Sequence, residues 1–191
     1  MRAGHHRYTL ADYLEISGTT QMKLEFLDGE IYAMAGGTPE HSALATAALL
    51  ELGRQLDGKP CRPYNSDLRV RVQISGLSTY PDVTVICGEF QRDPQDRNAA
   101  VNPTVLVEVL ADSTEAYDRG PKFEGYRTVA SLKEYVLISH REKLIEVFRR
   151  GEGEVWTRSE ARTEGLAKLR AIGCTLEVNR VYAGVELQKG R

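Results

Sequence analysis

An almost continuous apolar run, NPTVLVEVL from Asn102 to Leu110, predicts one buried β-strand in the middle of the chain. Glu108 is the one charged residue in this run. Removing a carboxylate from water costs on the order of several kcal/mol unless a partner compensates the charge. Glu108 therefore lies at an exposed strand end, pairs with a cation, or belongs to a site that binds metal.

Local signals in the first third of the chain predict two helices and a hairpin. Thr9 is a suitable N-cap for a short helix, Asp28-Gly29 is a strong hairpin-turn dipeptide, and Thr38-Pro39 is a typical helix start. The expected elements are a helix over 9–16, a hairpin over 23–34, and a helix that ends at about Leu56 before Gly58.

The remainder of the chain predicts strands with one short helix among them. Expected strands cover 67–73, 82–87, 104–110, 134–139, 144–149 and 154–157, with a last one near Leu176. The polar segments 88–101 and 112–120 are expected to be loops, and Pro121 is expected to begin a short helix to about Val129. This order predicts an α/β or α+β domain around one central sheet.

Composition limits the class of protein. A chain of 191 residues, 41% hydrophobic and 27% charged, fits one soluble globular domain over 1–191. No apolar run reaches transmembrane length, and the N-terminus shows no signal-peptide pattern, so a cytoplasmic location without membrane contact is expected. The net charge of −2 argues against a tight, non-specific DNA binder but allows a small basic face.

The three cysteines are odd in number and far apart in the sequence. Cys61, Cys87 and Cys174 contain no CxxC pair and favour a reducing cytosol over a disulfide scaffold. A zinc site with cysteine ligands is therefore not expected.

Two carboxylates on neighbouring expected strands indicate a metal site. Pro81 marks a strand start, so Asp82 begins one apolar strand and Glu108 lies near the end of the next. If the two strands pair as a long-loop hairpin, both carboxylates meet at one edge of the sheet. Mg²⁺ binds to one or two protein carboxylates, keeps several waters and accepts phosphate oxygens. Lys122, soon after the second strand, could steady an attacking water or a developing charge.

Each candidate also has a purely structural interpretation. Asp82 could be a turn residue, Glu108 could be exposed, and Lys122 could pair with Asp118 four residues earlier on a helix. Glu25 could be a surface acid of the hairpin. The other positions of interest are His41, interpreted as structural, Asp67, which could end a strand, and Tyr126, expected to pack over the site. No role is assigned to His5 and His6.

The order of motifs resembles a known family. YPDVTVI, NPTVLVEVL, STEAYDRGPKFEGYR and SLKEYVLIS, together with the earlier LEFLDGEIYAM and TPEH, are similar to the Uma-type restriction endonucleases of the PD-(D/E)xK nuclease superfamily. The likeness covers roughly residues 8–150. It implies a restriction-endonuclease-like α/β fold, with a central mixed β-sheet flanked by helices, and metal-dependent cleavage of phosphodiester bonds.

The resemblance also assigns roles to individual residues. Asp82 matches the family's PD aspartate, Glu108 its acidic strand residue, and Glu25 the glutamate of its N-terminal hairpin. The superfamily lysine two positions after the acid is replaced here by Leu110, and the lysine of this branch matches Lys122 on the following helix. His41, Asp67, Asp118 and Tyr126 match recurrent positions. The segment 111–114 departs from the family's usual Ser-Pro-Ser-Thr type of turn.

The expected function is therefore a Mg²⁺-dependent endonuclease acting on DNA, with Mn²⁺ as a possible substitute. Asp82 and Glu108 would hold the ion, with Glu25 as a further or water-mediated ligand, and Lys122 would act on the reacting groups. A homodimer is expected, because a double-strand cut by one-site subunits needs two copies. Two rivals stay open: a non-catalytic nucleic-acid-binding module on the same fold, and a metal-dependent phosphoesterase acting on RNA or a small phosphorylated molecule.

Overall fold

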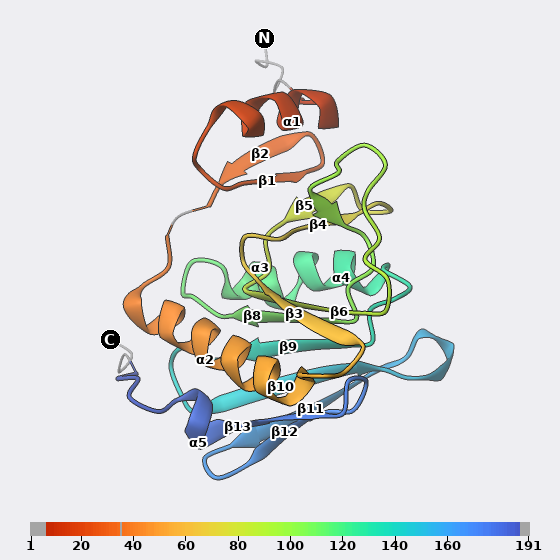
Figure 1. The fold of residues 1–191 in the computed structure, drawn as a ribbon. Coiled ribbons are helices and arrows are strands. Elements are labelled where there is room, and N and C mark those ends of the chain that lie inside the picture. Colours follow the sequence, from red (N-terminus) through yellow and green to blue (C-terminus); the bar gives the residue numbers. More distant parts are fainter. Residues whose placement is uncertain (1–6, 35, 188–191) are drawn as a thin grey trace.

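The strands form a six-stranded sheet, a five-stranded sheet and a small hairpin (Figure 1). The computed structural model describes residues 7–34 and 36–187. The helices are α1 (Leu10–Thr19), α2 (Pro39–Leu56), α3 (Glu115–Arg119), α4 (Pro121–Arg127) and α5 (Val178–Val181), with a 3₁₀ turn at Glu152–Glu154. In spatial order, the larger sheet contains β11 (Trp156–Arg162), β10 (Leu144–Arg150), β9 (Glu134–Ile138), β8 (Val105–Val109), β6 (Val83–Cys87) and β3 (Cys61–Asn65).

The five-stranded sheet combines strands that precede the long helix α2 in the sequence with strands that follow it. Its spatial order is β2 (Glu30–Ala33), β1 (Leu24–Leu27), β5 (Leu77–Thr79), β4 (Arg69–Val72) and β7 (Ala99–Ala100). The hairpin consists of β12 (Leu166–Leu169) and β13 (Cys174–Glu177). The expectation of a single central sheet was therefore too simple, because the N-terminal hairpin joins a second sheet.

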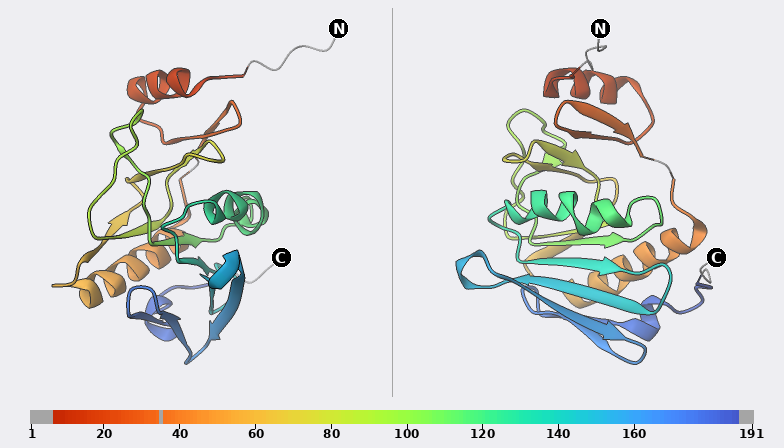
Figure 2. Two further views of the ribbon diagram at one scale, coloured as in Figure 1. Left: turned by 90° about the vertical axis from the view of Figure 1, so that its right-hand side faces the viewer. Right: turned by 180° about the vertical axis from the view of Figure 1, so that it is seen from behind.

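Helices cover both faces of the six-stranded sheet. Its strands pair antiparallel, except for β8 and β9, which are parallel. On one face α2 buries residues at four-residue intervals, which are Leu44, Ala48, Leu52 and Leu56. On the other face lie α3 and α4 (Figure 2), where Phe123 and Tyr126 pack in a cluster with Leu106 and Leu110. Glu108 alternates with these two leucines and shares their face.

Local signals placed the first elements correctly. Thr9 forms a capping box with Asp12 at the start of α1, and Thr38 caps α2, where Pro39 occupies the first turn. Asp28 and Gly29 have φ values of 51° and 80°, so the β1–β2 turn uses the left-handed conformation that this dipeptide favours.

The segment 112–120 is not a loop, as its polarity suggested, but contains α3. Asp118 of this helix is buried, and Arg119 forms ion pairs with Glu115 of the same helix and with Glu146 of β10. Charged side chains on this helix therefore pair within the protein, and one of the partners, Glu146, lies on a strand distant in the sequence.

Other differences from the sequence prediction concern short strands. The expected strand over 154–157 is a 3₁₀ turn followed by β11, and the segment 88–101 contains the short strand β7. The strands β3, β5 and β12 were not expected. They are at most five residues long, too short for a local period to identify them, and each is fixed by hydrogen bonds to a partner strand.

The cysteine pattern, which favoured a reducing cytosol over a disulfide scaffold, did not predict the disulfide that the structure contains. Cys61 on β3 and Cys87 on β6 lie directly opposite each other in the antiparallel register and form a disulfide. Cys174 is a buried free thiol. The sequence could not show the pairing, because it depends on the register between an unexpected strand and β6.

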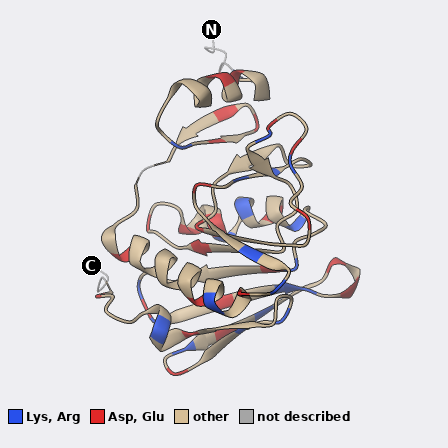
Figure 3. Ribbon diagram, in the orientation of Figure 1, with Lys and Arg blue, Asp and Glu red and all other residues tan. Residues whose placement is uncertain are grey.

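Charged residues of both signs are interspersed along the ribbon (Figure 3), as the small net charge suggests. Within residues 7–34 and 36–187, no helix combines the length and the apolarity needed to cross a membrane. His5 and His6 lie outside the described residues.

Candidate active site

Asp82 and Glu108 approach each other across the pairing of β6 and β8. The register sets Val83 opposite Val107 and Thr84 opposite Leu106, so the start of β6 lies beside the end of β8. The carboxylate of Asp82 accepts a hydrogen bond from the backbone N–H of Val109, at 2.7 Å. The predicted antiparallel pairing is confirmed.

Glu108 is buried and has a cationic partner. Its side chain is 5% exposed, and Oε1 lies 2.9 Å from Lys122 Nζ. The same oxygen accepts a hydrogen bond from the Tyr126 hydroxyl at 2.8 Å. Of the environments that the sequence left open for Glu108, the exposed strand end is excluded.

Lys122 places one ammonium group among three carboxylates. Besides Glu108, its Nζ lies 3.3 Å from Asp118 Oδ1 and 3.5 Å from Glu25 Oε1. Lys122 and Asp118 come from the adjacent helices α4 and α3, and Glu25 comes from β1. Glu25 is also a buried acceptor for the Thr79 hydroxyl, so the interpretation of Glu25 as a surface acid is wrong.

Burial and neighbouring charges shift the pKa values of this cluster. Burial raises the pKa of Glu108 to about 8, because desolvation and the nearby Asp118 and Asp82 outweigh Lys122. Burial lowers the pKa of Lys122, but the carboxylates around it reverse this effect and hold the pKa well above its ordinary value. The ammonium stays charged at neutral pH, while Glu108 has a strong tendency to hold a proton.

His41 is closer to the proposed acids than the sequence suggested. It lies in the first turn of α2, and its Nε2 is 3.3 Å from Asp82 Oδ2. The hydrogen bond to Asp82 raises the pKa of His41, against the opposing effect of burial. A Cβ added at Gly37 would lie 2.7 Å from His41 Nδ1, so glycine at this position gives the imidazole room.

Of the other positions singled out in the sequence, Tyr126 lies in the cluster around Lys122 and Asp67 does not. Tyr126 is fully buried and packs over Glu108, as expected, and its hydroxyl also bonds the carboxylate. Asp67 lies in an exposed turn, where it pairs with Lys23 at 2.8 Å. In the unusual 111–114 segment, Asp112 is exposed and pairs with Arg141. The structure therefore places Tyr126 in the cluster and places Asp67 and Asp112 in surface ion pairs.

Two contacts of the site were missed by the sequence analysis. Thr79, which bonds Glu25, lies on a three-residue strand with no signal of its own. His41 was interpreted as structural because a lone histidine in a helix carries no pattern. The TPEH motif of the family resemblance was the one signal that could have drawn attention to it.

A family model and two sequence relatives match most of this chain. Residues 10–179 match the family model described as "Uma2: Putative restriction endonuclease". Two relatives from Synechocystis sp. strain PCC 6803 are the uncharacterized proteins slr1290 and sll1609. The first is 34% identical, covering 91% of this chain and 90% of its own, and the second is 31% identical, covering 82% and 88%.

A solved structure has the same fold. It is a crystal structure from Anabaena variabilis ATCC 29413, described as that of a putative nuclease belonging to DUF820. The TM-score is 0.75 at 16% sequence identity, with 93% of this chain and 99% of the other covered. The fold is thus restriction-endonuclease-like, with a mixed α/β architecture whose sheets are flanked by helices. The chain belongs to the Uma2 family.

Proposed function

We propose that the protein is a divalent-metal-dependent endonuclease that hydrolyses DNA phosphodiester bonds. One observation carries the proposal: the acids Asp82 and Glu108 converge on the face of the sheet where the buried Lys122 ammonium lies 2.9 Å from Glu108. Membership of a family described as restriction endonucleases supports this assignment. Glu25 completes the proposed site through its position beside Lys122.

The donor chemistry fits Mg²⁺, with Mn²⁺ as a substitute. Both described contacts to Glu108 are made by Oε1, and both described contacts to Asp82 are made by Oδ2. None of these four contacts involves Glu108 Oε2 or Asp82 Oδ1. Within residues 7–34 and 36–187, no three His, Cys, Asp or Glu side chains are grouped to hold a metal. A pair of carboxylates suits Mg²⁺, which retains several waters. The ion would supply Lewis acidity toward a phosphoryl oxygen.

The other residues of the site act on position and charge. The Lys122 ammonium would orient the attacking water or stabilise negative charge that develops on the phosphate. Glu25 and Asp118 keep this ammonium charged and in place. The Tyr126 hydroxyl fixes the orientation of the Glu108 carboxyl group.

Cleavage of plasmid DNA tests the proposal. With Mg²⁺ or Mn²⁺, the wild-type protein should convert supercoiled DNA to nicked or linear forms, and EDTA should stop the reaction. Asp82→Asn should lose about 10²-fold or more in rate and most Mn²⁺ binding by calorimetry. Asp57→Asn, which changes an exposed aspartate at the end of α2, should behave as wild type. Equal cleavage and equal Mn²⁺ binding by wild type and Asp82→Asn would contradict the proposal.

A second candidate is a metal-dependent phosphoesterase acting on RNA or a small phosphorylated molecule. The net charge of −2 supports this alternative, because the chain has no excess of basic residues, and Figure 3 shows charges of both signs interspersed along the ribbon. A panel of plasmid, single-stranded DNA, RNA and a phosphodiester chromogen separates the two by which substrate is turned over fastest. Sedimentation at several concentrations tests the expected homodimer.

A further inference from the structure

A hollow of about 290 Å³ lies where α2 ends and β3 begins. Lys59, Arg62, Tyr64 and Ile86 contribute to its wall, and the lining contains no acidic residue. The hollow lies outside the cluster around Lys122.

Neither cation of this hollow forms an ion pair with a carboxylate among residues 7–34 and 36–187. Lys59 and Arg62 are both exposed. Other exposed arginines, such as Arg54 and Arg162, pair with glutamates. Unpaired cations in a concave, acid-free wall provide a positive site for an anion.

The strand register connects the hollow to the proposed active site. In the antiparallel pair, Arg62 lies opposite Ile86 and Tyr64 lies opposite Thr84. Thr84 is in turn opposite Leu106, which shares its face with Glu108. Arg62 and Tyr64 are therefore on the sheet face that carries Glu108.

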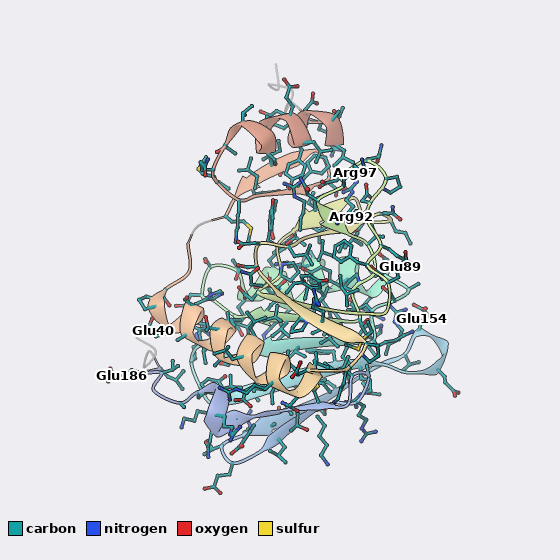
Figure 4. The ribbon with its side chains drawn as sticks, in the orientation of Figure 1. Glu40, Glu89, Arg92, Arg97, Glu154 and Glu186 are labelled. Atoms are coloured by element: carbon teal, nitrogen blue, oxygen red, sulfur yellow. A yellow bond between two sulfur atoms is a disulfide. The ribbon has the colours of Figure 1, made fainter. Side chains whose placement is uncertain are left out.

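The neighbouring loop, residues 88–101, carries charges of both signs. The Tyr64 ring meets Phe90 edge-on at 5.7 Å, and the Arg92 guanidinium lies over the Phe90 ring, 5.0 Å from its centroid. Figure 4 shows Glu89, Arg92 and Arg97 on this loop at one side of the molecule. These three loop residues are two arginines and one glutamate, and the lining of the hollow adds Lys59 and Arg62 without an acid.

We propose that this hollow binds a phosphate of the nucleic-acid backbone, away from the scissile bond. The proposal rests on the nuclease function above. Continuing the β3–β6 register, Arg62 lies four residues along the edge from the level of Asp82, or ~13 Å at ~3.3 Å per residue. With ~3.4 Å of helix rise per phosphate along one strand, this span is roughly four nucleotides. The contact would position the strand without reading its sequence.

Oligonucleotide binding without metal tests this site separately from cleavage. Arg62→Ala and Lys59→Ala should each weaken binding of a fluorescein-labelled duplex several-fold, and together by about tenfold, measured by anisotropy in EDTA. Each should also reduce the slope of log K against log salt by about one. Arg170→Ala is the charge-matched control, because Arg170 is exposed at the start of the β12–β13 turn and its side chain forms no described ion pair.

Each result has a definite meaning. The phosphate site would be overturned if Arg62→Ala and Lys59→Ala had the same duplex affinity and salt slope as Arg170→Ala. It would also be overturned if the wild-type protein bound no duplex. Inorganic phosphate should compete with the duplex less strongly for the site variants than for wild type. If the variants bind duplex more weakly but phosphate competes equally well in variant and wild type, a direct phosphate contact is overturned. If the site variants weaken binding while wild-type protein cleaves nothing, the phosphate site stands and the nuclease proposal fails. If wild type cleaves and the variants bind normally, only the phosphate site fails.

Discussion

One ammonium group, that of Lys122, is shared by the carboxylates of Glu25, Glu108 and Asp118. Removing a partner from such a cluster has unequal effects. Loss of one carboxylate leaves Lys122 with two others, whereas loss of the ammonium leaves buried acids without compensation. The same geometry that suits a catalytic lysine therefore makes Lys122 important for stability.

Lys122→Met should lower the free energy of unfolding by about 3–5 kcal/mol at neutral pH, because it leaves buried carboxylates unpaired. It should also reduce cleavage by about 10²-fold or more. Urea unfolding at neutral and mildly acidic pH measures the first effect, which should shrink when the acids take up protons. Lys168→Met, an exposed control on β12, should be near neutral. If Lys122→Met left both stability and cleavage unaltered, Lys122 would be neither a stabilising partner of these acids nor a catalytic residue.

Glu108→Gln should melt, without metal, at the same temperature as wild type or higher. The pKa of Glu108 is raised from 4.5 to about 8 in the folded state, so its charge costs free energy as pH rises through this range. The advantage of glutamine should be largest above about pH 8 and smallest near pH 4.5. Mn²⁺ should raise the melting temperature of this variant less than that of wild type. A strong destabilisation with no difference in the metal response would make Glu108 structural.

At the scale of elements, local signals predicted what local forces determine. The caps Thr9 and Thr38 and the Asp28-Gly29 turn are visible in the sequence and confirmed in the structure. The helix α3 and the strand β3 were missed, because partners far along the chain stabilise them. The convergence of Asp82 and Glu108 was predictable, since both lie at ends of clear apolar strands, whereas the contact of His41 with Asp82 was not.

The Cys61–Cys87 disulfide should stabilise the pairing of β3 with β6. The two cysteines are 26 positions apart, and closing a loop of this size stabilises the fold by about 3 kcal/mol in the chain-entropy estimate. The double variant Cys61→Ala, Cys87→Ala should lose stability of this order in urea unfolding.

Reduction is the control for the disulfide. Dithiothreitol should lower the stability of wild type toward that of the double variant and leave the variant unchanged. Equal stability of oxidised and reduced wild-type protein would contradict the prediction.

At the scale of the whole molecule, ion pairs to one buried carboxylate connect α3 to the far strands of the large sheet. Glu146 of β10 is buried and contacts Arg119 of α3 and Arg158 of β11, each at 2.6 Å. Burial acts to raise the pKa of Glu146, but the hydrogen bonds from the two arginines outweigh it and lower the pKa below 4.5. The helix that carries Asp118 is thereby anchored to β10.

Acid should weaken this anchor. A carboxyl group with a lowered pKa adds stability above its unfolded pKa and loses it as pH falls through the folded value. Glu146→Gln should therefore be less stable than wild type at pH 7, with a difference that shrinks as the pH falls below 4.5, the ordinary pKa of this carboxyl group. Urea unfolding across this range measures the difference, with the exposed Glu160→Gln as control. A difference that does not depend on pH would exclude an ionic origin.

The proposed catalytic cluster draws on β1, β8, α3 and α4, which are separated by much of the chain. Contacts between residues so distant in sequence form slowly, because long loops must close before the contacts stabilise anything. The parallel pairing of β8 with β9 adds to this delay. During refolding, α2 and the β1–β2 hairpin can form early from their own signals, whereas the pocket of acids around Lys122 must be among the last features to assemble. Nascent chains would thus acquire helical content well before they acquire the capacity to cut nucleic acid.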